Sequence, residues 1–562
     1  MIFTLLNIKK IQTAIFFIGT FCFVLPINKP CLAQTTFQDS SILPLIIINT
    51  MGQVILDEPK ITAHMGIINN YQGLYNHPTD SFNEYDGLIG IELRGSSSSF
   101  FSKKGYGVET RDSLGQNNNV PLFGMPSEND WVLHGPYSDK SLIRNYLAYY
   151  CGSRMYNYCP RTQFVEIIIN SEYKGVYLFV EKIKRDKGRV KVSKLDDDDL
   201  SGDSLTGGYI IKIDKTTGVN NDSWLSNFQT NSSNPKDVSF LYHYPEADDI
   251  KPAQKTYIQS FLFTFENALS SPFFLDSIIG YKQYTDINSF VDYYLLNEAT
   301  RNVDGYRIST FMYKDRDSEN NKLVIGPPWD YNLGWGNADY CDGGLTTGWA
   351  SDFNSICPGD NSQIPFWWQR MLTDTEFLNR LNCRWDELRQ GPFHTDSMFV
   401  LVDSMGSILS QPAFRNFNTW DILNTWVWPN NFVGGTYSAE LTYLKNWIAN
   451  RFLWIDNNLP GFASDCSFLT DSEIKKPSIL IFPNPYINQF YIDIHGKNEK
   501  KEVLISMYDL SGILIFSHQS KVSSSSVISS NELLKGKHIA SGIYILSIQF
   551  SDEKHNYKLI KK

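Results

Sequence analysis

Asp304 and Asp330 each stand in a loop-like setting beside a short apolar segment of the sequence. Asp304 lies in N-V-D-G-Y, with Ser309 five residues on, and Asp330 lies in P-P-W-D-Y-N, with Asn332 two residues on. One carboxylate can accept the proton of an attacking hydroxyl. A second can hold a divalent metal ion that bridges nucleotide phosphates. The pair predicts phosphoryl transfer, with Asp304 as catalytic base, Asp330 as metal ligand, and Ser309 and Asn332 as secondary ligands.

The elements around these aspartates must bring the two loops together. A helix is expected over Ile287–Thr300, directly before the Asp304 loop. After Ser309, F-M-Y, a charged turn and K-L-V-I-G predict a hairpin that delivers P-P-W-D-Y-N. The two carboxylates are therefore expected to face one cleft.

Nucleotide binding would also need cations that contact phosphate oxygens. Lys104 follows a serine-rich turn and is the candidate lysine, with Lys103 a near-equal competitor. Arginine suits this task because its guanidinium matches phosphate oxygens in a bidentate way. The candidates for binding the nucleotide are Lys104, Arg94, Arg144 and, at the adenine end of the cleft, Glu181.

Four long motifs carry a family resemblance. They are R-N-V-D-G-Y-R, G-P-P-W-D-Y-N-L-G-W-G-N, E-N-D-W-V-L-H-G-P-Y-S-D-K-S-L-I-R-N and E-Y-K-G-V-Y-L-F-V-E-K-I. Together, over roughly 42–456, they resemble the spore-coat CotH kinase family. The resemblance implies an atypical protein-kinase-like fold that uses ATP with Mg²⁺ or Mn²⁺ to phosphorylate Ser or Thr of exported or surface proteins.

The sequence departs from the kinase pattern at two of its candidate ligands. Ser309 stands where the catalytic loop of protein kinases has a metal-binding Asn, and Asn332 stands where many relatives have a second Asp. The site therefore carries less negative charge, which favours weaker metal binding or a single metal. The alternative function is a catalytically inactive pseudokinase that serves surface assembly or binds polysaccharide.

The order of elements predicts an α+β fold. Strands dominate before residue 215 with one prominent helix, Asp139–Tyr156, and helical patterns dominate afterwards. A β-rich N-lobe before a helical C-lobe fits a two-lobe kinase-like domain over 42–460. The expected helices after residue 250 are Lys255–Leu269, Ile287–Thr300, Asp374–Glu387, Thr395–Ser410 and Ala439–Asn457.

The C-terminal part changes character. A polar stretch, 461–478, predicts a linker, and short alternating strands over 479–562 predict a small all-β sandwich. F-P-N-P, Y-D-L-S-G and S-G-I-Y-I-L resemble the sorting domain of the type IX secretion system. That resemblance implies the type IX machinery as a partner and a secreted or cell-surface location.

The N-terminal residues and the cysteines agree with export. Two lysines precede an apolar stretch and a small-residue cleavage pattern, which predicts a signal peptide over 1–33 and no stable transmembrane segment. Six cysteines follow it, an even number that fits disulfides. Six cysteines allow fifteen pairings. Distance along the sequence favours Cys151–Cys159, Cys341–Cys357 and Cys383–Cys466.

Composition excludes several classes of protein. The formal net charge of −10 and pI near 5.5 argue against a nucleic-acid partner. The sequence has no C-x-x-C pair and no G-x-x-x-x-G-K-[ST] segment, which argues against a zinc site and a P-loop. The 13 Trp, 31 Tyr and 36 Phe fit either an aromatic core or rings that stack on sugars.

Overall fold

The computed structural model describes the chain from residue 39 to residue 561 with gaps. The described residues are 39–70, 74–216, 223–462, 466, 478–482, 486, 489–495, 501–509, 512–522, 525–550 and 554–561. The expected signal peptide and most of the expected linker lie outside these ranges. Helices and strands both contribute substantially, so the chain is of the α+β class, as expected.

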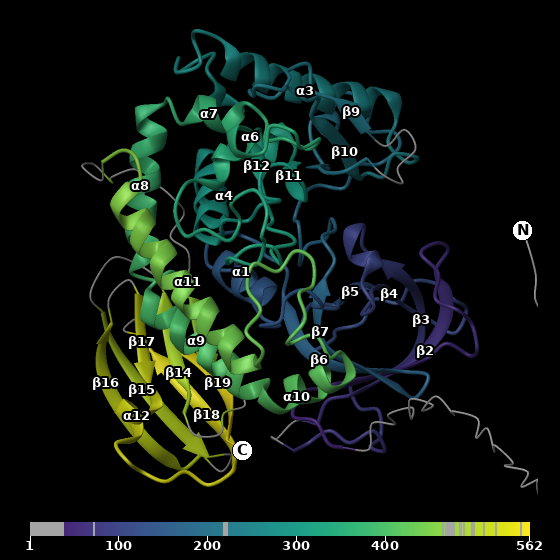
Figure 1. Cartoon of the computed structure of the whole chain (residues 1–562), viewed down its shortest axis with the longest axis vertical. Coiled ribbons are helices and arrows are strands. Elements are labelled where there is room, and N and C mark those ends of the chain that lie inside the picture. The colour runs from purple at the N-terminus through teal and green to yellow at the C-terminus, as the bar shows by residue number, and fades with distance from the viewer. Residues whose placement is uncertain are drawn as a thin grey trace, which may run out of the picture.

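Seven strands near the N-terminus close into a barrel in the order β1-β2-β3-β4-β5-β7-β6 (Figure 1). Neighbours are antiparallel except β1 and β6, which pair in parallel and close the barrel. Alternating apolar side chains fill its interior. The strands are β1 Leu45–Asn49, β2 Ile61–Ile68, β3 Tyr85–Arg94, β4 Gly105–Arg111, β5 Asp130–His134, β6 Thr162–Ile169 and β7 Glu172–Glu181.

The helix between β5 and β6 is shorter than expected. It was predicted over Asp139–Tyr156, but α1 spans Arg144–Gly152. The carboxylate of Asp139 accepts hydrogen bonds from the backbone N–H groups of Ser141 and Arg144 at 3.1 and 2.8 Å, which holds the preceding residues in a turn. The side chain of Asp139 therefore postpones the start of the helix to Arg144.

A second sheet has the strand order β12-β11-β8-β10-β9. The predicted hairpin is confirmed, because β11 (Thr310–Lys314) and β12 (Leu323–Ile325) pair in antiparallel fashion. The other strands are β8 Tyr209–Ile213, β9 Ser223–Leu225 and β10 Ser239–Tyr244. β11 also pairs with β8, so this short hairpin belongs to a larger sheet.

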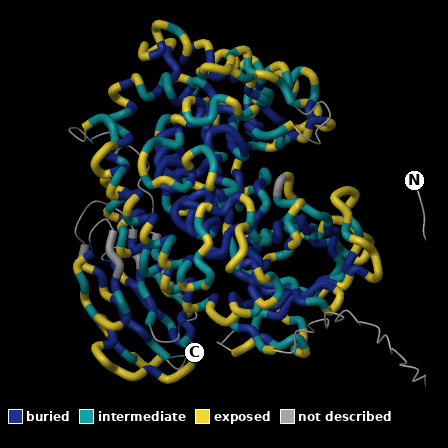
Figure 2. Tube along the Cα trace, in the orientation of Figure 1, coloured by how far each residue is buried: buried dark blue, intermediate teal, exposed yellow. Residues whose placement is uncertain are grey.

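Helices follow, and the predicted ones lie within three residues of their observed bounds. Their apolar faces meet in one large core, visible as the buried centre of Figure 2. The long helices are α3 Pro252–Ser270, α4 Ile287–Thr300, α8 Thr375–Arg389, α9 Thr395–Ile408, α10 Ser410–Thr419 and α11 Tyr437–Asn458. The short ones are α2 Gly202–Leu205, α5 Asp317–Asn320, α6 Phe353–Ile356 and α7 Trp367–Met371, with 3-10 turns η1 Ser97–Phe100, η2 Tyr281–Gln283 and η3 Ala350–Asp352.

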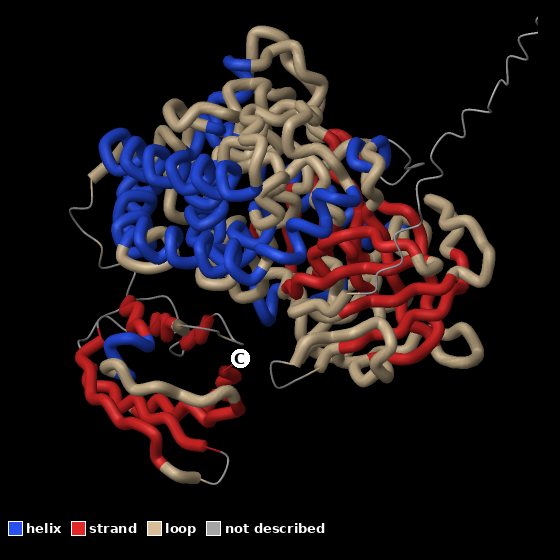
Figure 3. Tube along the Cα trace, turned by 60° about the horizontal axis from the view of Figure 1, so that its bottom comes forward, coloured by secondary structure: helices blue, strands red, loops and turns tan. Residues whose placement is uncertain are grey.

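The C-terminal part forms a block composed mainly of strands (Figure 3), and Tyr491 in one of these strands packs against the core of the helical part. It contains two sheets, β13-β14-β17 and β16-β15-β18-β19, around a core of its own. Its elements are β13 Ser478–Phe482, β14 Tyr491–His495, β15 Lys501–Asp509, β16 Leu514–Val522, β17 Ser525–Ser529, α12 Ser530–Leu534, β18 Gly542–Gln549 and β19 Lys554–Lys561. Of the helices in the described ranges, none combines the length and apolar character that a membrane crossing requires.

Two of the three expected disulfides form, and one prediction was wrong. Cys341 bonds Cys357, and Cys383 bonds Cys466. Cys151 and Cys159 are both free and buried. On α1, the Cys151 sulfur lies 3.8 Å from the sulfur of Met398, whereas the Cys159 thiol lies 3.4 Å from the Tyr149 carbonyl. Closeness in sequence was misleading because each thiol packs against a different neighbour.

Candidate active site

The register of the second sheet brings the predicted loops to one edge. Thr310 pairs with Ile213, and Met312 pairs with Ile325. The start of β11 therefore lies beside the ends of β8 and β12. Ser309, Asp214 and the segment leading to Asp330 leave the sheet at this common edge, and the Asp304 loop leads into the same strand start.

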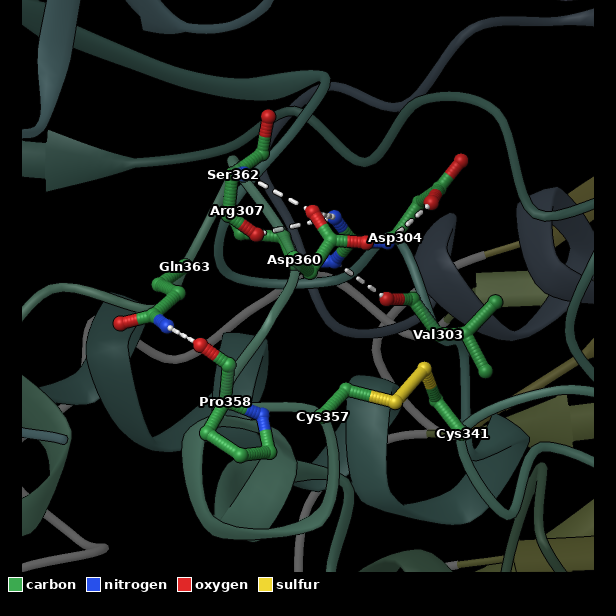
Figure 4. The surroundings of a disulfide bond; sticks show 9 residues. All are labelled: Val303, Asp304, Arg307, Cys341, Cys357, Pro358, Asp360, Ser362 and Gln363. Atoms are coloured by element: carbon green, nitrogen blue, oxygen red, sulfur yellow. Dashed lines mark hydrogen bonds and ion pairs between the residues drawn. A yellow bond between two sulfur atoms is a disulfide. The ribbon is translucent and has the colours of Figure 1, made fainter. Parts of the chain in front are cut away.

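Asp304 is held by an arginine from the next turn of its own loop. The Arg307 guanidinium contacts an Asp304 carboxylate oxygen at 2.9 Å and Asp360 at 3.2 Å, and it donates to the carbonyls of Val303 and Ser362 at 2.7 and 2.9 Å (Figure 4). Arg307 is 3% exposed, while the Asp304 side chain keeps 21% exposure. The Asp304 carboxylate is thus fixed at one oxygen and still accessible to solvent.

The pKa of Asp304 reflects two opposing influences. Burial raises the pKa above 3.8, and the positive charges of Arg307 and Lys215 lower it. The nearby carboxylates of Asp214 and Asp360 raise it further. A raised carboxylate pKa strengthens the group as a proton acceptor.

A buried ion pair stabilises the end of α4, directly before the Asp304 loop. Glu298 in α4 and Arg451 in α11 are fully buried, with 3.1 Å between them. The Glu298 carboxylate also accepts from the backbone N–H groups of Ala350 and Ser351 at 2.7 and 2.8 Å and from the Tyr306 hydroxyl at 3.1 Å. Glu298 and Arg451 each have several partners, so this network of hydrogen bonds fixes where α4 ends and the Asp304 loop begins.

Asp330 occupies a strained backbone conformation. Its φ is +62°, in the left-handed region that residues other than glycine rarely adopt. Its N–H donates to the Tyr149 hydroxyl at 3.3 Å, and its carbonyl accepts from the Asn302 side chain at 3.4 Å. Such conformations cost about 1–3 kcal/mol and persist where the surroundings over-determine them, often at functional sites.

Burial and the charge of Asp304 raise the pKa of Asp330 from 3.8 to about 6. Asp214 raises it further, while Arg94 and Lys215 lower it. The charge of Asp304 thus disfavours ionisation of Asp330, and a bound cation would offset that repulsion. This charge pattern fits a divalent metal ion at Asp330.

Arg94 ends strand β3 and lies over this site from the barrel side. Its guanidinium carbon is 5.1 Å from the centre of the Trp329 ring, next to Asp330 in sequence. Burial lowers the pKa of Arg94, and the charge of Asp330 opposes that change. The structure therefore places Arg94 and Asp304 close to Asp330.

The other candidates for nucleotide binding make different contacts. Lys104 donates to the carbonyl of Ser99 at 2.7 Å, in the serine-rich turn. Arg144 is 1% exposed, pairs with Asp139 at 2.6 Å and donates to the Trp335 carbonyl at 3.4 Å. Glu181 is fully buried, pairs with Arg161 at 2.6 Å and accepts from the Arg161 backbone N–H at 3.0 Å. Arg144 and Glu181 thus take part in ion pairs of the protein framework.

Lys103, the competitor of Lys104, is buried inside the protein. Its ammonium group donates to the Val176 carbonyl and to the Asn416 side chain at 2.5 and 2.7 Å. Burial holds its pKa well below 10.5. Lys103 therefore joins the barrel to α10, and Lys104 is the better placed of the two for a ligand.

The predicted secondary ligands stand near the same sheet edge but form no ready-made metal cluster. Ser309 has φ +52° and is partly exposed, as is Asn332, whose carbonyl accepts from the Asn337 side chain at 2.9 Å. In the part of the chain that the structure describes, no three His, Cys, Asp or Glu side chains converge as metal ligands. Carboxylate, hydroxyl and amide oxygens, as in Asp330, Ser309 and Asn332, are ligands that Mg²⁺ accepts.

Comparison with known families assigns the greater part of the chain. The family described as "CotH kinase protein" matches residues 91–455, which is more than half of the sequence. The chain belongs to the CotH kinase family. This match contains the Asp304 loop, the Asp330 loop and α1.

A second family, described as "Secretion system C-terminal sorting domain", matches residues 480–562 of this CotH family member. The sorting domain implies export by the type IX system and a surface or secreted location, as predicted. The two disulfides agree with export.

Individual proteins add little to these family matches. No curated protein matches the chain significantly. Among solved structures, the chain is similar to dimeric latent PorU from Porphyromonas gingivalis, with 20% identity and a TM-score of 0.14 over 15% of this chain and 9% of that chain. The chain thus spans less than a tenth of that relative.

Four residues of the site were not predicted as site residues. Asp214 and Lys215 follow β8 in the segment I-K-I-D-K, and their place at the sheet edge depends on a pairing with β11 that the sequence does not reveal. Arg307 and Asn145, whose side-chain oxygen accepts from the Tyr331 N–H at 2.6 Å, are the last residues of two of the family motifs. Their position inside those motifs was the available signal.

Proposed function

We propose that this protein is a CotH-like atypical kinase that transfers the γ-phosphoryl group of ATP to Ser or Thr hydroxyls of exported or surface proteins. The proposal rests chiefly on Asp304 and Asp330, two partly exposed carboxylates at the edge of one sheet, where the charge of Asp304 raises the proton affinity of Asp330. Membership of the CotH family supports it.

Asp304 acts as the catalytic base. The acceptor hydroxyl oxygen attacks the γ-phosphorus, the bond from that phosphorus to the β,γ-bridging oxygen breaks, and ADP leaves. The hydroxyl proton passes to the free oxygen of the Asp304 carboxylate, while Arg307 holds the other oxygen at 2.9 Å. Fixing one oxygen orients the other toward the nucleophile, which is the main contribution of the protein in phosphoryl transfer.

Asp330 would hold the metal ion, Mg²⁺ or Mn²⁺, with Ser309 and Asn332 as secondary ligands. Bound there, the metal would supply positive charge that offsets the negative charge developing on the phosphate oxygens. Arg94, stacked over Trp329, would contact the phosphates from the barrel side, and Lys104 would approach from the serine-rich turn. Arg144 and Glu181 would act through the framework that they stabilise.

The test is phosphoryl transfer from labelled ATP with Mg²⁺ or Mn²⁺ by the full chain. The acceptors are the protein itself and a serine-rich peptide. We expect incorporation that Asp304→Asn reduces at least a hundredfold, whereas Asp248→Asn, at an exposed loop position, has no effect. Absence of incorporation, with no thermal shift on adding ATP and metal, would contradict the proposal and favour an inactive family member that serves as a surface binding protein.

A further inference from the structure

Helix α1 contacts the backbone of the Asp330 loop through two side chains. The Asn145 side-chain oxygen accepts from the Tyr331 N–H at 2.6 Å, and the Tyr149 hydroxyl accepts from the Asp330 N–H at 3.3 Å. Asn145 and Tyr149 are four residues apart, so they lie on the same face of the helix. Two successive N–H groups of the loop therefore bond to two successive turns of α1.

Asn145 also reaches the barrel. Its side-chain nitrogen lies 3.1 Å from Nε2 of His134, the last residue of β5. Because the Asn145 oxygen accepts from Tyr331, its nitrogen is the group that donates to His134. One amide side chain thus links the barrel, through α1, to the residue that follows Asp330.

The end of the loop has a matching pair of contacts. The Trp335 indole N–H donates to the Arg144 carbonyl at 3.2 Å, and Arg144 donates to the Trp335 carbonyl at 3.4 Å. Trp335 has φ +55°. Both ends of the segment from Asp330 to Trp335, which have positive φ angles, are therefore held by α1. The last two residues of the motif S-L-I-R-N, Arg144 and Asn145, lie in this helix and make these contacts.

We propose that Asn145 is a positioning residue that, together with Tyr149, sets the backbone of Asp330 and so aims its carboxylate at the metal site. This inference rests on the proposed function, since it assumes that Asp330 binds the metal. Asn145 has no contact with substrate in this role.

Four variants of the full chain test the proposal, and the fourth, Asn145→Asp, is a rescue variant. Asn145→Leu removes both hydrogen bonds of the side-chain amide and keeps a similar side-chain volume. Tyr149→Phe removes only the hydroxyl and keeps the ring near Trp329. Asn76→Leu is the matched control. Asn76 is also buried, and both its side-chain oxygen and its side-chain nitrogen form hydrogen bonds, but its partners belong to the barrel region and not to the Asp330 loop.

The first readout is hydrogen exchange of the backbone amides of residues 329–332, which needs no metal. We expect exchange at least tenfold faster in Asn145→Leu and at least threefold faster in Tyr149→Phe, with no change in Asn76→Leu. Asn145→Asp keeps the accepting oxygen, so slow exchange of the Tyr331 amide is expected to return. Unchanged exchange in both Asn145→Leu and Tyr149→Phe would overturn the proposal.

The second readout is Mn²⁺ affinity in the presence of ATP, followed by electron paramagnetic resonance. Asn145→Leu is expected to weaken Mn²⁺ binding at least tenfold, and Tyr149→Phe about threefold. If wild type binds Mn²⁺ and both variants bind it equally well, the positioning role is wrong and the proposed function stands. If wild type itself binds no Mn²⁺, the proposed function fails, and the positioning role fails with it.

Discussion

Replacing Asp330 by Asn is expected to stabilise the metal-free protein at alkaline pH. The folded protein raises the pKa of Asp330 from 3.8 to about 6, first by burial and then by the charge of Asp304. The ionised carboxylate is therefore disfavoured in the fold. Stability falls as pH rises from about 3.8 to about 6 and stays reduced above that range. Asp330→Asn removes this penalty, because the amide has no charge.

The size of the effect follows from the difference between the two pKa values. At about 1.36 kcal/mol for each pH unit, the charge costs at most about 3 kcal/mol at pH 8 and about 1 kcal/mol at pH 4.5. Asp330 is partly exposed, and solvent screening reduces both values. We expect Asp330→Asn to gain about 1–3 kcal/mol at pH 8 and clearly less at pH 4.5.

The assay is urea unfolding followed by tryptophan fluorescence at both pH values. All 13 tryptophans precede residue 461, so the signal reports the CotH domain and not the sorting domain. Asp248→Asn, at an exposed position, is the control for loss of a surface charge. A gain in Asp330→Asn that is the same at both pH values would refute the electrostatic explanation and point to the preference of Asn for a positive φ. No gain at pH 8 would refute the raised pKa itself.

Four further variants test individual contacts. Arg307→Met removes the cation that lowers the pKa of Asp304, so the acid limb of the rate profile for phosphoryl transfer should move to higher pH, with at least tenfold loss of rate at pH 7; an unmoved limb would contradict this. Lys103→Ala should lower the free energy of unfolding by about 2–4 kcal/mol, because buried acceptors lose their donor. Lys104→Ala should leave that free energy unchanged and raise the KM for ATP at least threefold; calorimetry and steady-state kinetics distinguish the two lysines. Replacing both cysteines of Cys341–Cys357 by Ser should cost about 3 kcal/mol from the closed loop, and urea unfolding with and without reductant would measure it.

Much of the fold could be predicted from local pattern. The helices with clear apolar periodicity, such as Ile287–Thr300, have the predicted limits, and the β11–β12 hairpin forms where its turn residues indicated. The helix predicted over Asp139–Tyr156 begins five residues late because a buried carboxylate satisfies the N–H groups of its first turn. Closure of the barrel through the parallel β1–β6 pair was beyond prediction, since no local signal specifies a pairing between residues 121 positions apart.

Asp304 and Asp330 could be selected from the sequence because each lies in a family motif, whereas residues that strand pairing brings to the site could not. In the structure, Asp304 and Arg94 both lie close to Asp330. Arg144 and Lys103 were misleading because a cation on a helix or strand has the same sequence signature whether it faces a cleft or a buried partner. Asp214 requires the β8–β11 register, which only the folded sheet provides.

The disulfide between Cys383 and Cys466 gives the chain a covalent topology that differs from its linear order. Cys383 lies in α8, and Cys466 lies between the CotH domain and the sorting domain. A protease that cuts after residue 466 and before 480 releases the tail as a separate fragment. A cut between Cys383 and Cys466 leaves the tail tethered to the CotH domain until the disulfide is reduced. Gel electrophoresis of the surface-released protein, with and without reductant, would therefore show on which side of Cys466 maturation takes place.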